Sequence, residues 1–189
     1  MRFILVLTFV VLCAAAMDAQ ERLEYRVIAT SKTSTMQKEM QEAGDEGFEY
    51  RGQTVFKSTF GGKEVIAILE RAEDGKSKPK YEYRLLASKK TSTMQKELLE
   101  ASEAGYEFRA QTVFETTFGG KEVVAILEKD RQARSGGFVY KLLATTRTST
   151  MEKELKAAGE EGYEVVGLAV GQTAVGGKEI VTITRKKGE

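Results

Sequence analysis

Three stretches of the chain, residues 24–71, 82–129 and 139–186, align with one another without a gap. The first two are identical at about two-thirds of their positions, and the third matches the second at about half, which indicates internal repetition. The segments between them, 72–81 and 130–138, are rich in charged residues, glycine and serine, as linkers are. The sequence therefore predicts three similar modules rather than the turns of a superhelix.

Each repeat has the pattern of a strand, a helix and a hairpin. A short β-rich segment opens every copy, and in the first copy it is Tyr25–Ala29. Met36, Met40 and Ala43 then recur at helical spacing, which predicts a helix with one apolar face against a sheet. Phe48–Phe56 and Glu64–Glu70 are β-rich again. The corresponding segments of the other copies predict the same elements.

Glycines and hydroxyl residues predict where these elements begin and end. Helix ends are expected at Gly47, Gly105 and Gly162, since a left-handed residue suits a C-terminal cap. Double glycines predict the hairpin turns, at Gly61-Gly62, Gly119-Gly120 and Gly176-Gly177. A serine followed three places later by Gln or Glu predicts a capping box at each helix start. These pairs are Ser34 with Gln37, Ser92 with Gln95, and Ser149 with Glu152.

The predicted fold class is α+β, with three tandem βαββ modules, each a three-stranded sheet with one helix on one face. A unit of this size buries limited apolar surface when it folds alone. We therefore expect the modules to pack on one another or to self-associate.

The N-terminus has the anatomy of a secretory signal over residues 1–19. Arg2 precedes an apolar run, and small residues follow, with cleavage expected after Ala16 or Ala19. The run is shorter than the roughly 20 residues of a membrane-spanning helix, so no stable membrane insertion is expected after cleavage. Acylation at Cys13 is an open alternative. The expected location is secreted or periplasmic.

The composition excludes several chemistries. The chain has no histidine and one cysteine, which removes the commonest general base, the usual metal-binding clusters and a disulfide framework. We expect no metal and no cofactor. Lys and Arg number 29 against 28 for Asp and Glu, so the basic surplus that nucleic-acid binding requires is missing.

The modules resemble an uncharacterised bacterial family of short βαββ domains. Its members begin with a Tyr-x-Lys/Arg strand and carry Gly-Trp-Glu after the helix, where this chain has Phe or Tyr in place of Trp. The matching segments are Tyr25–Val27 with Ala43–Glu49, Tyr83–Leu85 with Ala104–Glu107, and Tyr140–Leu142 with Ala158–Glu164. This resemblance implies a fold but no activity. A looser topological similarity exists to dodecins, which assemble into flavin-binding shells.

The second strand of each repeat differs between the copies. Strict alternation would place Arg51 and Gln53 on one polar face, with Arg109 and Gln111 at the same positions of the second copy. In the third copy this face becomes apolar, with Val166, Leu168 and Val170. An exposed apolar sheet face requires a cover, so these three residues are predicted to form an inter-module or oligomer interface.

The leading functional hypothesis is a non-enzymatic binding or assembly protein whose repetition gives multivalency. Self-association or a protein partner is expected. Its contact surface is predicted to consist of Arg51, Gln53, Phe60, Arg109, Gln111 and Phe118, with burial in the core as the alternative for the two phenylalanines. The alternative is a carrier that holds an aromatic ligand between modules. A hydrolase that uses two carboxylates ranks last.

Overall fold

The computed structural model of the 189-residue chain describes residues 22–57, 62–73, 79–88, 90–115, 121–133, 137–172 and 177–188. The expected signal segment with Cys13 lies outside these ranges, as do Phe60, Phe118 and most of the hairpin glycines.

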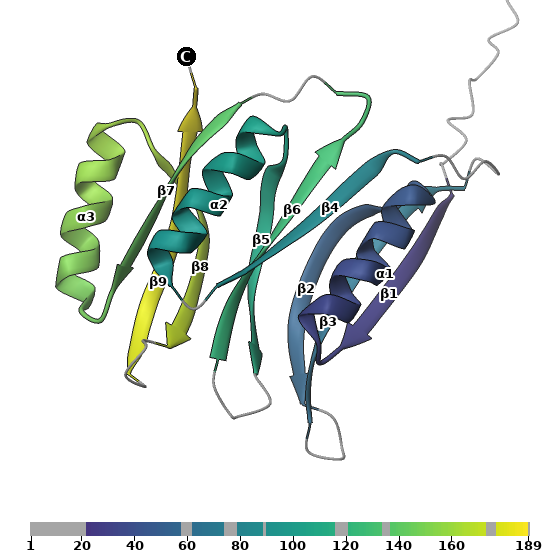
Figure 1. Cartoon of the computed structure of the whole chain (residues 1–189), viewed down its shortest axis with the longest axis horizontal. Coiled ribbons are helices and arrows are strands. Elements are labelled where there is room, and N and C mark those ends of the chain that lie inside the picture. The colour runs from purple at the N-terminus through teal and green to yellow at the C-terminus, as the bar shows by residue number, and fades with distance from the viewer. Residues whose placement is uncertain are drawn as a thin grey trace, which may run out of the picture.

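Each module has the predicted βαββ order (Figure 1). Module 1 comprises β1 (Leu23–Thr30), α1 (Thr33–Asp45), β2 (Glu49–Lys57) and β3 (Lys63–Ala72). Module 2 comprises β4 (Tyr81–Ser88), α2 (Thr91–Glu103), β5 (Glu107–Glu115) and β6 (Lys121–Asp130). Module 3 comprises β7 (Phe138–Thr145), α3 (Thr148–Glu160), β8 (Glu164–Gln172) and β9 (Lys178–Lys187). In each antiparallel sheet the last strand lies between the other two, which confirms the α+β fold with three modules.

Each sheet has two faces because side chains alternate along its strands. We call the face covered by the module's own helix the helix face, and the opposite one the reverse face. On the helix face of module 1, Val65, Ala67 and Leu69 of β3 are buried beneath α1. The predicted helical stripe of Met36, Met40 and Ala43 is fully buried against them, so this prediction is confirmed.

The helix covers only part of its helix face, and the next module covers much of the rest, although Val55 of β2 stays 46% exposed. Tyr83, Val124 and Ile126 on the reverse face of module 2 belong to the same buried cluster as the core of module 1. Module 3 repeats the arrangement, because its Tyr140 and Ile183 complete the core of module 2. The modules therefore form a stack with continuous cores, with their helices on the same side in Figure 1.

The helices begin before the predicted serine caps, so the capping-box prediction is wrong. The N-cap residues are Lys32, Lys90 and Arg147, and none of them makes a side-chain capping bond. The turn before each helix is instead held by a hydroxyl two residues before the N-cap. In module 1 the Thr30 Oγ1 accepts from the Lys32 N–H at 3.1 Å. The Gln37 side chain is unavailable for a cap because it bonds to module 2.

The helix ends follow the prediction. Gly47, Gly105 and Gly162 have φ values of 87°, 88° and 85°, and no other described residue has a positive φ. Glycine reaches this left-handed region without a Cβ clash, and it ends each helix before the second strand begins.

Replacing Gly162 with alanine tests this conformational requirement, because a Cβ there would meet open space and only the φ is unfavourable. We expect Gly162→Ala to lower the free energy of unfolding by about 1 kcal/mol. The matched control is Gly159→Ala, which also meets open space but lies inside α3, and it should stabilise by up to about 1 kcal/mol. Urea unfolding of both variants measures the difference, and equal effects would contradict it.

Candidate functional site

Glutamine side chains join each of the first two helices to the edge of the next sheet. The Gln37 Nε2 donates to the Tyr83 carbonyl at 2.8 Å, and its Oε1 accepts from the Leu85 N–H at 2.7 Å. Gln95 makes the equivalent two bonds to β7, also at 2.8 and 2.7 Å. An open strand edge is a template for pairing with other chains. These amides therefore cover the edges of β4 and β7.

Module 3 has a different residue at this helix position. Glu152 is exposed, and the described chain has no later module for it to contact. A carboxylate accepts hydrogen bonds but donates none, so it cannot reproduce the bond from glutamine to a strand carbonyl. The difference between the copies thus coincides with the end of the stack.

The glutamine contact can be tested by making module 1 resemble module 3. In Gln37→Glu the bond from the Leu85 N–H is retained, but the Tyr83 carbonyl loses its donor and faces a carboxylate. We expect a loss of about 1–3 kcal/mol in the free energy of unfolding, measured in urea. Gln132→Glu adds the same charge at an exposed position and should change stability by less than about 0.5 kcal/mol. Equal losses in both variants would argue against the contact.

A buried carboxylate forms a second connection between modules 1 and 2. The Glu128 Oε2 accepts from the Tyr50 N–H at 3.0 Å and from the Tyr83 hydroxyl at 2.7 Å, while its Oε1 accepts from the Arg109 Nε at 2.8 Å. A β-bulge at Arg51 interrupts the ladder beside Tyr50. The neighbouring module therefore satisfies a backbone donor beside an irregular point of the sheet.

The charges around Glu128 are compensated. Burial, and then the adjacent carboxylate, raise the pKa of Tyr83, so its hydroxyl remains a donor. Burial by itself lowers the pKa of Arg109, but the neighbouring carboxylates, Glu128 first and then Glu49 and Glu107, together raise it by more, and the guanidinium stays charged. In the next interface a hydroxyl replaces the carboxylate, because the Phe108 N–H donates to the Tyr140 hydroxyl at 2.8 Å.

Removing the charge of Glu128 should be costly. We expect Glu128→Gln to reduce the free energy of unfolding by about 3 kcal/mol, since Arg109 keeps only its longer contact with Glu49 at 3.8 Å and the amide offers fewer acceptors. The control is Glu164→Gln, whose carboxylate pairs with Arg185 but is 63% exposed, and a change within about 0.5 kcal/mol is expected. Similar losses in chemical unfolding of the two variants would rule out a special role for Glu128.

The structure separates the polar residues that alternation places together. The bulge directs Arg51 to the reverse face, where its Nε lies 2.7 Å from a carboxylate oxygen of Glu70, and Arg109 takes the same position beside Glu128. Gln53 lies on the helix face instead. The expectation of one shared face is wrong because the bulge shifts the register.

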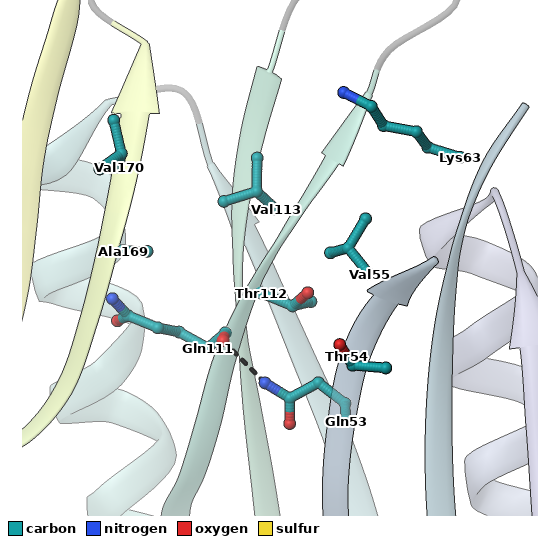
Figure 2. Close-up of a pocket in the computed structure, with 9 residues that line it drawn as sticks. All are labelled: Gln53, Thr54, Val55, Lys63, Gln111, Thr112, Val113, Ala169 and Val170. Atoms are coloured by element: carbon teal, nitrogen blue, oxygen red, sulfur yellow. Dashed lines mark hydrogen bonds between the residues drawn. The ribbon is translucent and has the colours of Figure 1, made fainter. Parts of the chain in front are cut away.

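Gln53 and Gln111 line a groove between the three modules (Figure 2). The Gln53 Nε2 donates to the Gln111 carbonyl at 2.8 Å, and the Gln111 Nε2 donates to the Val181 carbonyl at 3.0 Å. The groove has a volume of about 380 Å³, with β2, β5 and β8 supplying most of its walls. Its described lining includes threonines, valines and Lys63 but no carboxylate and no aromatic ring.

The helix face of module 3 is open. Leu168 is 68% exposed and Val170 50%, and both lie on this face of β8. Between α3 and the sheet is an almost wholly apolar cavity of about 420 Å³, with Met151 and Leu155 on one wall and Leu168 on the other. Val166 lies at the bulge and packs against the core of module 2 instead. The interface role of these residues stays a prediction.

The reverse face of module 1 is open as well, and sequence reasoning missed it. Tyr25 is 61% exposed and Val27 63%, whereas the equivalent Tyr83 is buried at 2% exposure. Phe56 and Ile68 extend the same exposed face. A signal was available in the sequence, since residues 1–23 contain no copy of the repeat.

Within the described ranges no three His, Cys, Asp or Glu residues come together as a metal-binding group. The helices described there are also too short or too polar to cross a membrane.

Comparison with known proteins finds no matching family model, no matching curated protein and no matching solved structure. The structure therefore defines the class of this protein by its fold alone, as an α+β protein of three repeated βαββ modules.

Proposed function

We propose that this chain is a non-enzymatic binding or assembly protein, secreted or periplasmic, that docks a protein partner at the open end of its stack. One observation carries the proposal: the next module completes the core on the helix face of modules 1 and 2, whereas no described residue does so in module 3, where Leu168 is 68% exposed. A continuous exposed apolar face is typical of a protein-interaction site. Membership of the bacterial βαββ family is part of this proposal, supported by the repeated element order.

The character of the open face favours a protein over a small molecule. Leu168 and Val170 project from the exposed part of β8. The surface of the cavity beside them is almost wholly apolar although Thr148, Glu152 and Thr182 line it, so few polar atoms there can orient a ligand. The groove in Figure 2 gives less support to the carrier alternative, because its described lining offers no aromatic stacking partner. A carboxylate hydrolase has less support still, since Glu49, Glu70 and Glu128 are engaged in ion pairs with arginines.

Photo-crosslinking tests the docking face directly. A photoreactive benzoylphenylalanine is introduced in place of Leu168, and in a control in place of Lys96, which is 79% exposed on α2 of module 2. Irradiation in the cells that make the protein should yield one defined protein adduct from position 168 and none from position 96. An absence of adducts at position 168, or the same adducts at both positions, would contradict the proposal.

A further inference from the structure

The reverse face of module 1 retains the residues with which module 2 docks. Tyr25 and Phe56 occupy the positions of Tyr83 and Phe114, which are both buried in the first interface. Ile68 stands where module 2 has the fully buried Ile126. Module 1 thus exposes an apolar reverse face of the kind that packs on the preceding module elsewhere in the chain.

The polar part of this docking surface is also present in module 1. Glu70 is equivalent to Glu128, and each carboxylate pairs with the arginine at the bulge of its own sheet, Arg51 or Arg109. In module 2 that carboxylate accepts a backbone N–H from the module before it. Module 1 has no preceding module, so Glu70 lacks this bond within the described chain.

The helix face of module 3 retains the receiving side. Met151 and Leu155 hold the positions of Met36 and Met40 in the apolar stripe of the helix. Gly159 corresponds to Gly44, where a Cβ would lie 2.5 Å from the Tyr81 carbonyl oxygen of the next module. Gly159 has open space around it, so this module keeps the small residue that lets a following strand approach.

A backbone donor is available at the same place in module 3. The equivalent N–H groups of Tyr50 and Phe108 are bound by the next module, by Glu128 and by Tyr140 respectively. Val165 stands at this position beside the bulge of β8, and no later module in the described chain reaches it. A reverse face that carries a tyrosine and a glutamate, as that of module 1 does, would supply the acceptor for the Val165 N–H.

We propose that the reverse face of module 1 docks on the helix face of module 3 of a second copy of this chain, continuing the intramolecular stack from molecule to molecule. This inference rests on the proposed function, and it identifies the partner. Because the two faces differ, the contact is heterologous and extends into open chains or closes into rings. Both existing module interfaces serve as its template.

Glu152 limits the strength of this contact. In a continued stack it would meet the edge of β1 as Gln37 meets β4, accepting one backbone N–H but opposing the Tyr25 carbonyl. The missing donor makes the intermolecular interface weaker than the two within the chain. Assembly is therefore expected to depend on protein concentration.

Sedimentation velocity of the purified full chain over a concentration series tests the proposal. The mean mass should rise with concentration. Glu152→Gln restores the amide donor and should tighten association about 10-fold. Lys96→Glu, on the exposed side of α2, should leave association unchanged.

Two charge substitutions block the ends separately. Val27→Glu disables the reverse face of module 1 and Leu168→Glu the helix face of module 3, and each should weaken self-association roughly 30-fold or more. Both positions are more than 60% exposed, so the fold should survive, which urea unfolding checks. Mixing the two variants restores one intact contact and should give a 1:1 complex that grows no further.

Three results would overturn the inference. They are a strict monomer for both the wild type and Glu152→Gln, undiminished association of either blocked variant, and a mixture that stays monomeric. If the chain is monomeric but position 168 crosslinks to a different protein, self-docking fails while the proposed binding function stands. If position 168 yields no adduct either, both fail.

Discussion

A single helix cannot cover one face of a three-stranded sheet, and the rest of this structure depends on that shortfall. In module 1 the helix buries its methionine stripe against part of the sheet, and the remainder of the core comes from module 2. Burying one large apolar side chain contributes about 1.5–3 kcal/mol, so side chains such as Tyr83 and Ile126 stabilise two modules at once. The buried Glu128 and the glutamine amides then fix the register of this contact. The modules are consequently interdependent, as in repeat proteins whose stability lies largely in the interfaces between units.

The two end modules of such a stack differ from the middle one, because each has one sheet face that no neighbouring module covers within the described chain. Module 3 differs where the described chain provides no cover: threonines stand in place of Ala67 and Leu69 on the central strand, and the Thr184 hydroxyl donates to the Lys141 carbonyl at 2.9 Å. Both threonines are buried at 1% exposure, so their hydroxyls make the core of module 3 itself less apolar. The exposed Leu168, which replaces a glutamine, and the retained Val170 and Gly159 have no comparable structural reason within the described chain. Their presence at this position, together with an intact reverse face on module 1, is the basis for regarding both ends as docking surfaces.

Much of the fold could be predicted from the sequence because the repeat presents each local signal three times. The helical stripe, the terminal glycines and the βαββ order all follow from spacing and conformational preference. The contacts between modules could not be predicted in the same way. A bulge shifts the register after Tyr50, so simple alternation assigns Arg51 and Gln53 to one face when the structure puts them on two. Gln37 has the spacing of a capping residue, but its amide forms hydrogen bonds with the edge of the neighbouring strand instead of with the helix start. Tertiary partners decided both cases, and a single sequence does not reveal them.

Native-state hydrogen exchange of the full chain measures the interdependence of the modules most directly. The backbone N–H groups of Tyr50 and Phe108 are bound only across module interfaces, and they should exchange as slowly as the central strands β3 and β6. At a protein concentration low enough for monomers, the Val165 amide of module 3 should exchange much faster. Rapid exchange at Tyr50 and Phe108, with β3 and β6 still protected, would contradict the shared-core stack and indicate three modules that fold separately.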